Sequence, residues 1–209
     1  MNAAFVTVRT DSTRFPCKAI WTMCGKFTIE YVIERAKESN ADKVILCTTE
    51  LKNDDILIRI AKALQIDYFR GSTEDKLMRW KGAVDQFGVD FFVTFDGDDL
   101  FCDSTFANLA FQQYQRYNSD FIEAKNVPCG TFTYGISASA LNKVCEIKGT
   151  TDTEMMAPYF TDTGLFKVEQ LEGVPVELQR PDLRLTLDYD ADFRQYEICL
   201  LYTSPSPRD

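Results

Sequence analysis

The fold is decided by residues 3–18, which read AAFVTVRTDSTRFPCK. The apolar run 3–8 predicts a strand that is buried on both faces, as in a parallel sheet. In a tight loop, backbone N–H groups, hydroxyl groups and the charged ends of Arg and Lys side chains can donate hydrogen bonds to the oxygens of a polyphosphate. A solvated basic loop after an edge strand would have the same composition. The loop carries the three cations Arg9, Arg14 and Lys18, and the hydroxyl side chains Ser12 and Thr13 lie among them.

The length and charge of the chain limit its fold and its partners. The 209 residues fit one domain large enough to bury a core, and 45% of them are hydrophobic. The formal net charge of −9 argues against nucleic acid or an anionic membrane as the main partner, because these bind basic surfaces. An anionic nucleotide would therefore need a local basic site, which the first loop supplies.

The absence of histidine, the spacing of the cysteines and the lengths of the apolar runs exclude several classes of protein. The chain has no histidine, which excludes Ser/His/Asp hydrolases, Cys/His proteases and histidine-ligated metals. Its seven cysteines form no C-x-x-C pair, which is typical of reduced cytosolic thiols. No apolar run approaches the length of a membrane span and no signal sequence precedes the first strand, so we expect a cytoplasmic protein.

Strands and helices alternate along the first half of the chain, which predicts a parallel α/β sheet. Ligands of such sheets bind at the carboxyl ends of the strands, where the first loop and the turn 96–99 both lie. The predicted strands are 43–48, 67–69 and 90–95. The predicted helices are 29–39, one that begins at Asn53 or Asp54 and reaches 64, and one capped by Ser72 or Thr73 that ends near 87.

The pattern is less regular after residue 104. We expect residues 126–165 to form an insertion that closes over a second substrate and contributes to dimerisation. A strand at 183–187 should place Asp188 at the same sheet edge as the turn 96–99. The other predicted strands are 120–123, 131–136 and 166–171, and the predicted helices are 104–117, 138–147, 152–160 and one from Ala191.

Four motifs occur in a fixed order along the chain. They are R-x-x-S-x-R-F-P-x-K in the first loop, RGSTEDKL at 70–77, DGD at 96–98 and RLTLD at 184–188. In sequence and spacing they resemble the cytidylyltransferases of surface-glycan synthesis, among them the spore-coat-polysaccharide, acylneuraminate and 3-deoxy-manno-octulosonate enzymes. The resemblance implies a Rossmann-like, three-layer nucleotide-diphospho-sugar transferase fold with a mostly parallel sheet.

The resemblance also implies an activity and its partners. An Mg²⁺-dependent enzyme would couple CTP to an acidic sugar or related acceptor. The products would be pyrophosphate and a CMP-conjugate, and the conjugate would serve cell-surface polysaccharide synthesis. Asp98 and Asp188 take the family's metal-ligand positions, and Lys18, Arg14 and Asp98 are the expected catalytic residues. A homodimer is expected. The expected nucleotide-binding residues are Arg9, Ser12, Arg14, Lys18, Arg70 and Asp75.

Some positions depart from the family pattern. Cys17 replaces the glycine that usually precedes the lysine, so the curvature of the loop can differ there. The family's motifs near 128–130 and 153–155 are altered, and both lie in the predicted acceptor region. The nucleotide half of the site is therefore closer to the family than the acceptor half.

The acidic turn at 96–99, and the function of the protein, have alternative interpretations. Asp96-Gly97-Asp98-Asp99 is also a common turn after a strand, in which Asp96 and Asp99 would act as caps or hydrogen-bond acceptors. A glycosyltransferase of similar fold could use Asp96-Gly97-Asp98 as an Asp-x-Asp metal motif. A non-catalytic nucleotide-binding protein is the third hypothesis. The three cations of the first loop favour a triphosphate over a sugar diphosphate.

The end of the chain has a different character. Residues 199–209 read CLLYTSPSPRD, which matches the conceptual translation of a transposase adapter used in sequencing libraries. We therefore expect residues 1–198 to be the cytidylyltransferase-like domain and 199–209 to be a read-through segment that is not native.

Overall fold

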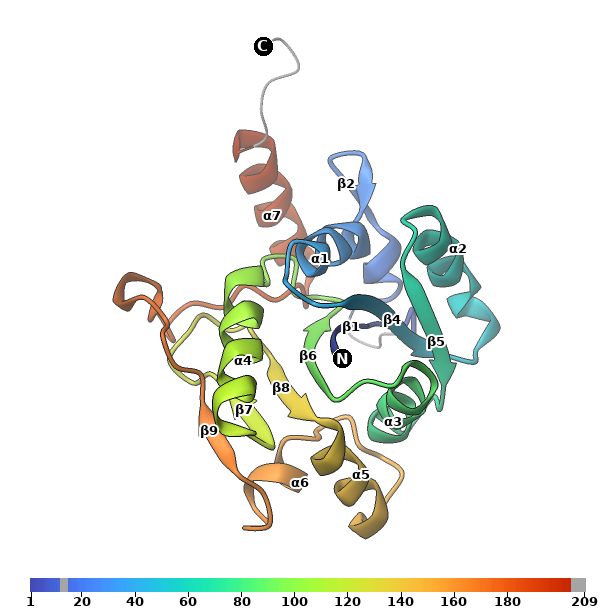
Figure 1. Cartoon of the computed structure of the whole chain (residues 1–209). Helices are drawn as coiled ribbons and strands as arrows, with labels where there is room; N and C mark the ends of the chain where they lie inside the picture. The colour runs from blue at the N-terminus through green and yellow to red at the C-terminus, as the bar shows by residue number, and fades with distance from the viewer. Residues whose placement is uncertain (12–14, 204–209) are drawn as a thin grey trace.

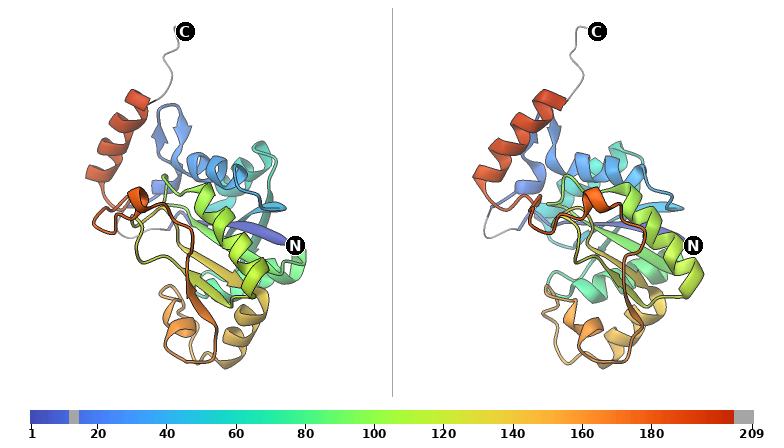
Figure 2. Two further views of the ribbon diagram at one scale, coloured as in Figure 1. Left: turned by 60° about the vertical axis from the view of Figure 1, so that its left-hand side comes forward. Right: turned by 90° about the vertical axis from the view of Figure 1, so that its left-hand side faces the viewer.

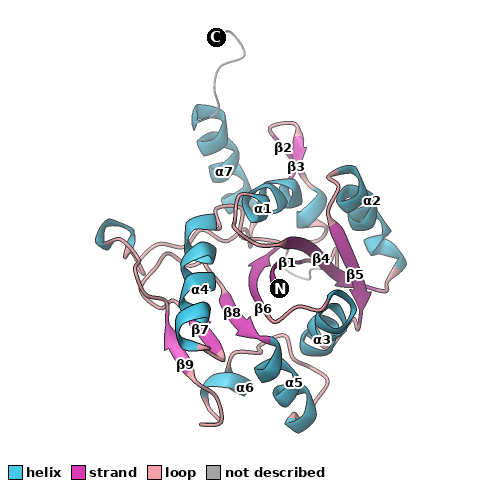
Figure 3. Ribbon diagram, in the orientation of Figure 1, coloured by secondary structure: helices cyan, strands magenta, loops and turns pink. Residues whose placement is uncertain are grey.

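A twisted central sheet with helices on both faces organises the molecule (Figure 3). The computed structural model describes residues 1–11 and 15–203, and within them the sheet has seven strands in the order β5-β4-β1-β6-β8-β7-β9. β1, β4, β5 and β6 are parallel, β8 is antiparallel to β6 and β7, and β9 is parallel to β7. The predicted mostly parallel α/β sheet is confirmed.

The elements follow the predicted alternation closely in the first half. The strands are β1 Asn2–Thr7, β4 Lys43–Thr49, β5 Asp67–Gly71, β6 Phe91–Asp96, β7 Phe121–Glu123, β8 Tyr134–Ser137 and β9 Val168–Gln170. The helices are α1 Thr28–Lys37, α2 Asp55–Ala63, α3 Lys76–Phe87, α4 Ser104–Tyr117, α5 Ala138–Ile147, α6 Pro158–Thr161 and α7 Asp190–Thr203. A small separate ribbon pairs β2 Thr22–Met23 with β3 Lys26–Phe27. None of the helices in this part of the chain has the length and apolar character that crossing a membrane requires.

Alternate residues of β1 enter two separate cores, which makes the three layers. Val6 packs in the cluster that α1, α2 and α4 share, whereas Phe5 packs in the cluster of α3, α5 and α6. The rings of Phe5 and Phe92 stack at 4.3 Å, and the indole of Trp80 meets Phe92 edge-on at 5.6 Å. The apolar run that predicted this strand is therefore buried on both faces.

A third cluster attaches α7 to the start of the chain. Phe15, Met23 and Tyr196 are buried together with residues beside β6 and before α7, and Cys24 lies 3.8 Å from the carbonyl oxygen of Glu197. Figures 1 and 2 show α7 beside the β2–β3 ribbon at one end of the molecule. α7 continues through residue 198 to Thr203, and the predicted boundary of the native domain at 198 stays a prediction.

Three predicted elements are wrong in detail. The segment 183–187 is not a strand: its backbone pairs with Cys129 in one isolated bridge, and the Leu187 N–H then donates to the Asp98 carbonyl oxygen instead of continuing that pairing. The predicted helix 152–160 is reduced to α6, which begins at Pro158. The cap of α3 is Asp75 rather than Ser72 or Thr73, since its carboxylate accepts from the Met78 N–H at 3.0 Å.

We predict that Asp75→Ala lowers the free energy of unfolding by about 3–5 kcal/mol, because it removes a cap and leaves the charge of Lys148 buried and unpaired. Asp75 forms an ion pair with Lys148 and accepts a hydrogen bond from the Thr153 hydroxyl at 2.9 Å, and both ion-pair side chains are buried. Urea denaturation measures the change.

Asp85→Ala is the matched control for this prediction. Asp85 pairs with Lys81 on the exposed face of the same helix, so its loss should cost less than about 1 kcal/mol. Equal losses in the two variants would contradict the structural role assigned to Asp75.

Candidate active site

A cleft of about 320 Å³ opens at the carboxyl ends of β1 and β6. Parallel neighbours end at the same sheet edge, so the loop after β1 and the turn after β6 face each other across it. Its walls include backbone and side chains from both strand ends and from the first turns of α3. The lining residues are Thr7, Val8, Arg9, Asp11, Lys18, Ala19, Lys76, Arg79, Asp96, Gly97, Asp98 and Glu154.

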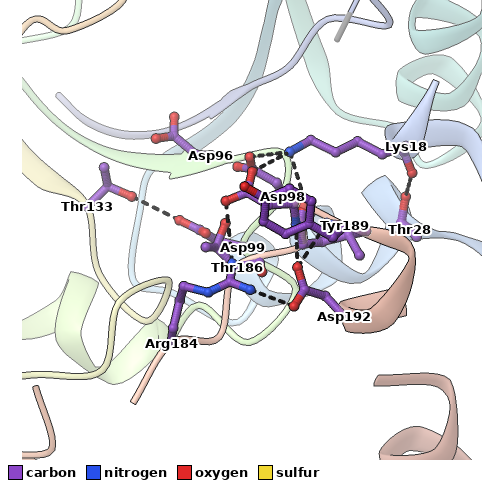
Figure 4. Close-up of polar contacts among 12 residues, drawn as sticks. Lys18, Thr28, Asp96, Asp98, Asp99, Thr133, Arg184, Thr186, Tyr189 and Asp192 are labelled. Atoms are coloured by element: carbon purple, nitrogen blue, oxygen red, sulfur yellow. Dashed lines mark hydrogen bonds and ion pairs between the residues drawn. The ribbon is translucent and has the colours of Figure 1, made fainter. Parts of the chain in front are cut away.

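The ammonium group of Lys18 joins the two predicted metal-ligand residues. Its Nζ lies 2.6 Å from Asp98 Oδ2, 3.3 Å from Asp188 Oδ1 and 2.7 Å from the carbonyl oxygen of Leu187. Figure 4 shows the Lys18 side chain extended toward Asp98. All three side chains are largely buried, so these contacts are screened less than surface ion pairs. The structure thus brings Lys18, Asp98 and Asp188 together.

The backbone near Lys18 explains its position. Cys17, which replaces a glycine of the family pattern, adopts the left-handed conformation at φ 59°. A short turn of 3₁₀ helix follows over Lys18–Ile20, and the Thr28 hydroxyl at the start of α1 donates to the Lys18 carbonyl oxygen. The left-handed conformation of Cys17 is unfavourable for a residue other than glycine, so the loop is strained there.

Asp188 reaches the site without a strand before it. The Leu187 N–H donates to the Asp98 carbonyl oxygen at 2.8 Å, which holds the segment against the turn after β6. Asp192, in the first turn of α7, accepts from the N–H groups of Asp188 and Tyr189 at 2.9 Å each. Arg184 lies 2.5 Å from Asp192 (Figure 4) and 3.4 Å from Asp188. These contacts fix the Asp188 carboxylate beside Asp98.

The two outer carboxyl groups of the turn have different surroundings. Burial raises the pKa of Asp96, and Lys76, 3.1 Å away, acts in the opposite direction. Burial together with Asp98 and Asp96 raises the pKa of Asp99 well above its usual range. Asp99 also accepts a hydrogen bond from the Thr133 hydroxyl at 3.4 Å, which acts in the opposite direction.

Arg79 is the unexpected residue of the cleft. Its side chain is only 2% exposed, yet its Nε and Nη1 have no hydrogen-bond partner among the described residues. Burial lowers its pKa, and Arg9 lowers it further. Buried guanidinium groups are normally paired, so an unpaired one at the wall of a cleft is suited to an anion or a carbonyl oxygen of a ligand.

Sequence reasoning did not single out Arg79 or Lys76. Lys76 lies in the 70–77 motif and Arg79 two residues beyond it, and they are three residues apart at the start of α3. That spacing places them on one face of a helix that begins near the sheet edge carrying the acidic turn. The helical spacing of these two basic residues could therefore have indicated the site. Their apolar neighbours, such as Trp80, give this face the pattern of a helix that packs in the core.

The other predicted nucleotide-binding residues have different positions. Arg9 lines the cleft and lies 3.7 Å from Glu154. Arg70 donates to Asp55 and to the carbonyl oxygens of Thr49 and Leu51, so it braces the loop after β4 and does not line the cleft. Asp75 caps α3 and pairs with Lys148, and it is not among the residues that line the cleft. Ser12 and Arg14 lie outside the described residues.

Asp98 and Asp188 could hold a divalent cation whose remaining coordination positions a bound ligand fills. No group of three or more potential metal-binding side chains occurs within residues 1–11 and 15–203. Asp98 and Asp188 nevertheless approach one cationic nitrogen, so a single cation can contact both. Mg²⁺ is commonly held by one or two carboxylates with waters and phosphate oxygens completing six ligands. The donor set therefore fits Mg²⁺.

A second cleft, of about 590 Å³, lies on the far side of the same carboxylates. Asp96 and Asp98 line both clefts, so the turn after β6 forms the wall between them. Eight of its seventeen lining residues come from the loop between β7 and β8, which enters the segment 126–165 predicted to contact the acceptor. It comprises Asp96, Asp98, Asp99, Glu123, Ala124, Lys125, Val127, Pro128, Cys129, Gly130, Phe132, Thr133, Tyr134, Met155, Pro181, Thr186 and Asp188.

Comparison with known proteins gives a match over nearly the whole chain. Residues 3–198 match the cytidylyltransferase family model. The chain is 24% identical to the spore coat polysaccharide biosynthesis protein SpsF of Bacillus subtilis over 196 residues, which covers 90% of this chain and 81% of that protein.

Solved structures share the fold. A cytidylyltransferase from Leptospira borgpetersenii superposes with a TM-score of 0.87 at 24% identity, covering 98% of this chain and 88% of that one. CMP:2-keto-3-deoxy-manno-octonic acid synthetase complexed with CTP superposes with a TM-score of 0.73 at 11% identity, covering 97% and 99%. The predicted three-layer nucleotidyltransferase fold is thereby confirmed.

We predict that Arg79→Met raises the free energy of unfolding of the ligand-free protein by about 1–2 kcal/mol, because it replaces a buried unpaired charge with an apolar chain of similar length. Thermal and urea unfolding measure the change. Arg59→Met, at an exposed position of α2, is the control and should change stability little. A clear loss of stability in Arg79→Met would show that the guanidinium is satisfied within the protein.

Proposed function

Because the chain belongs to the cytidylyltransferase family, we propose that it transfers CMP from CTP to a hydroxyl group of a small-molecule acceptor and releases pyrophosphate. The observation that carries the proposal is the contact of Lys18 with Asp98 and Asp188, since it puts a cation and two metal-binding carboxylates at one point between two clefts. A phosphoryl group transferred between ligands of the two clefts would react there.

The first cleft is the proposed nucleotide site. Arg9, Lys76 and Arg79 give its wall three cations in a chain of net negative charge. Lys18 would contact the phosphates when the nucleotide enters, because an ammonium group already held at this point needs little reordering. Arg79 has two nitrogens, Nε and Nη1, without a partner among the described residues, and we propose that they donate to the nucleotide. The related synthetase that was solved with CTP supports a CTP site in this fold.

Asp98 and Asp188 are the proposed ligands of Mg²⁺, which when bound would offset charge on the phosphates during transfer. Arg184 and Asp192 orient Asp188 from the side opposite Lys18. The chain contains no histidine, so a carboxylate is the available protein group to accept the acceptor hydroxyl's proton. Asp96 lines both clefts, so it is the carboxylate that we propose for this role.

The second cleft is the proposed acceptor site. The family resemblance implies an acidic sugar as one class of acceptor and cell-surface polysaccharide as the destination, and the similarity to SpsF supports the latter. A cytoplasmic location and a homodimer belong to the same proposal. The glycosyltransferase hypothesis is not favoured by the turn, because Asp96 pairs with Lys76 and does not join Asp98 and Asp188 around Lys18.

The direct test measures pyrophosphate release with each of the four nucleoside triphosphates, Mg²⁺ and a panel of hydroxylated acceptors. We expect release with CTP that depends on both the acceptor and the divalent cation. Release without an acceptor, or equal rates with all four nucleotides, would contradict the proposal.

In the same assay, Asp98→Asn and Asp188→Asn should each reduce turnover strongly, because each removes charge from the shared cation while preserving shape. The double variant should lose much less than the product of the two single losses, since groups that act through one ion behave as a unit. Circular dichroism serves as the control for folding. Multiplicative losses would show that the two residues act independently.

A further inference from the structure

Asp54 is a buried carboxylate that contacts the loop after β1. It is fully buried and ends a short turn of 3₁₀ helix over Lys52–Asp54, directly before α2. Its Oδ1 accepts hydrogen bonds from the N–H and the hydroxyl of Thr10, at 2.8 and 2.7 Å. Its Oδ2 accepts from the hydroxyl of Thr48 at 3.1 Å and from that of Thr49. One carboxylate thus joins the loop after β1 to the end of β4.

The place of Asp54 in the sequence would suit a different contact. It directly precedes the first turn of α2, where an Asp side chain usually accepts a hydrogen bond from an N–H group of its own helix. Asp54 makes no such bond. Its side chain turns to Thr10 and to the end of β4 instead, so its hydrogen bonds hold these two segments rather than the helix.

The charge of Asp54 strengthens these contacts. Burial alone would raise the pKa of Asp54, but the hydrogen bonds from Thr49, Thr10 and Thr48 outweigh it and lower the pKa. The group is therefore a carboxylate at neutral pH, and hydrogen bonds to an ionised acceptor are about twice as strong as those between neutral groups. Asp54 thus holds Thr10 firmly at both its N–H and its hydroxyl.

Thr10 transmits this constraint to Lys18. Its carbonyl oxygen accepts from the Cys17 N–H at 3.1 Å, which closes the loop after β1 on itself. Cys17 directly precedes Lys18, whose ammonium group joins the two acidic residues of the site. Arg9, which lines the first cleft, directly precedes Thr10. Both described ends of the loop are therefore attached to Thr10, and Thr10 is attached to Asp54.

The turn that carries Asp54 is braced from β5. Arg70, near the end of that strand, donates to the carbonyl oxygens of Thr49 and Leu51 at 2.9 and 2.8 Å. It also pairs with Asp55 at 2.7 Å. These contacts lie on both sides of Asp54 in the sequence, so they fix the turn from which its side chain reaches Thr10. Arg70 does not line the first cleft, but it supports the residue that holds the loop.

We propose that Asp54 is a positioning residue of the active site: through Thr10 it fixes the loop after β1 so that Lys18 reaches the two carboxylates between the clefts. Asp54 is not among the residues that line either cleft, so its effect on the reaction would pass through Lys18. The catalytic part of this proposal rests on the proposed function, whereas the placement of Lys18 can be tested in the ligand-free protein.

The first experiment follows the Lys18 ammonium group in the ligand-free protein by NMR of ¹³C- and ¹⁵N-labelled lysine, with Lys18→Arg to identify the signal. Asp54→Ala removes the four hydrogen bonds of the carboxylate, and Thr10→Val removes the hydroxyl contact alone. We expect the Lys18 signal to move in both variants, because the loop loses the contact that fixes it. Asp54→Asn keeps an oxygen that can accept from Thr10, so it should restore the signal in part.

The matched control is Asp120→Ala. Asp120 also accepts from a backbone N–H and a hydroxyl, those of Lys167 at 2.9 Å and Ser137 at 3.3 Å. It is not among the residues that line either cleft, so its loss should leave the Lys18 signal in place.

Two NMR results would overturn the inference. One is a Lys18 signal that stays in place in Asp54→Ala and Thr10→Val, and the other is an equal movement in Asp120→Ala. Circular dichroism checks the fold of each variant, and Thr10→Val alone decides the outcome if Asp54→Ala does not fold.

The second experiment measures pyrophosphate release from CTP and Mg²⁺ with an acceptor that the wild-type protein uses. Asp54→Ala should lower kcat/KM for CTP by about tenfold or more, because small displacements of a reacting group slow a reaction steeply. In a Lys18→Ala background the same substitution should cost much less, since residues that act through one group behave as a unit. An unchanged kcat/KM, or the same loss in both backgrounds, would overturn the inference.

The two experiments separate the inference from the proposed function. Failure of the wild-type protein to release pyrophosphate with any nucleotide and acceptor contradicts the proposed function. The NMR experiment then still decides whether Asp54 positions Lys18.

Discussion

The contact between the Lys18 ammonium group, Asp98 and Asp188 is the constraint on which the rest of the site depends. It joins the loop after β1, the end of β6 and the segment before α7, which are far apart in the sequence. Without a cation at this point, two carboxylates would face each other in a partly buried site, which is unfavourable. The ion contacts thus keep the two carboxylates together in the ligand-free protein.

The sheet makes that contact possible. β1 lies between β4 and β6 and is parallel to both, so its following loop emerges at the edge where β6 also ends. Its side chains enter the cores on both faces, which leaves the strand little freedom to shift in register. Two clefts then open on either side of the turn after β6, and their walls differ in charge: cations from α3 line the first, and carboxylates dominate the second.

The strands and helices that could be predicted from the sequence are those with a clear pattern of apolar residues within the element itself. The apolar runs of β1, β4 and β6 and the helical spacing of α1, α2 and α4 predict these elements to within a few residues, because burial sets their periodicity. Asp98 could be placed at the sheet edge for the same reason. The site around Asp188 could not be derived locally, since its position depends on the Leu187–Asp98 backbone hydrogen bond and on Asp192. The resemblance, not the predicted strand, identified it.

The central claim is that Asp98 and Asp188 together hold one divalent cation against a nucleotide. The most direct measurement is anomalous diffraction from crystals of the protein grown with CTP and Mn²⁺, which has the ligand preferences and size to replace Mg²⁺. We predict one anomalous peak at about 2.1 Å from an oxygen of each carboxylate, with Lys18 moved onto the phosphates. A peak that contacts only one of the two residues, or none at this sheet edge, would contradict the account.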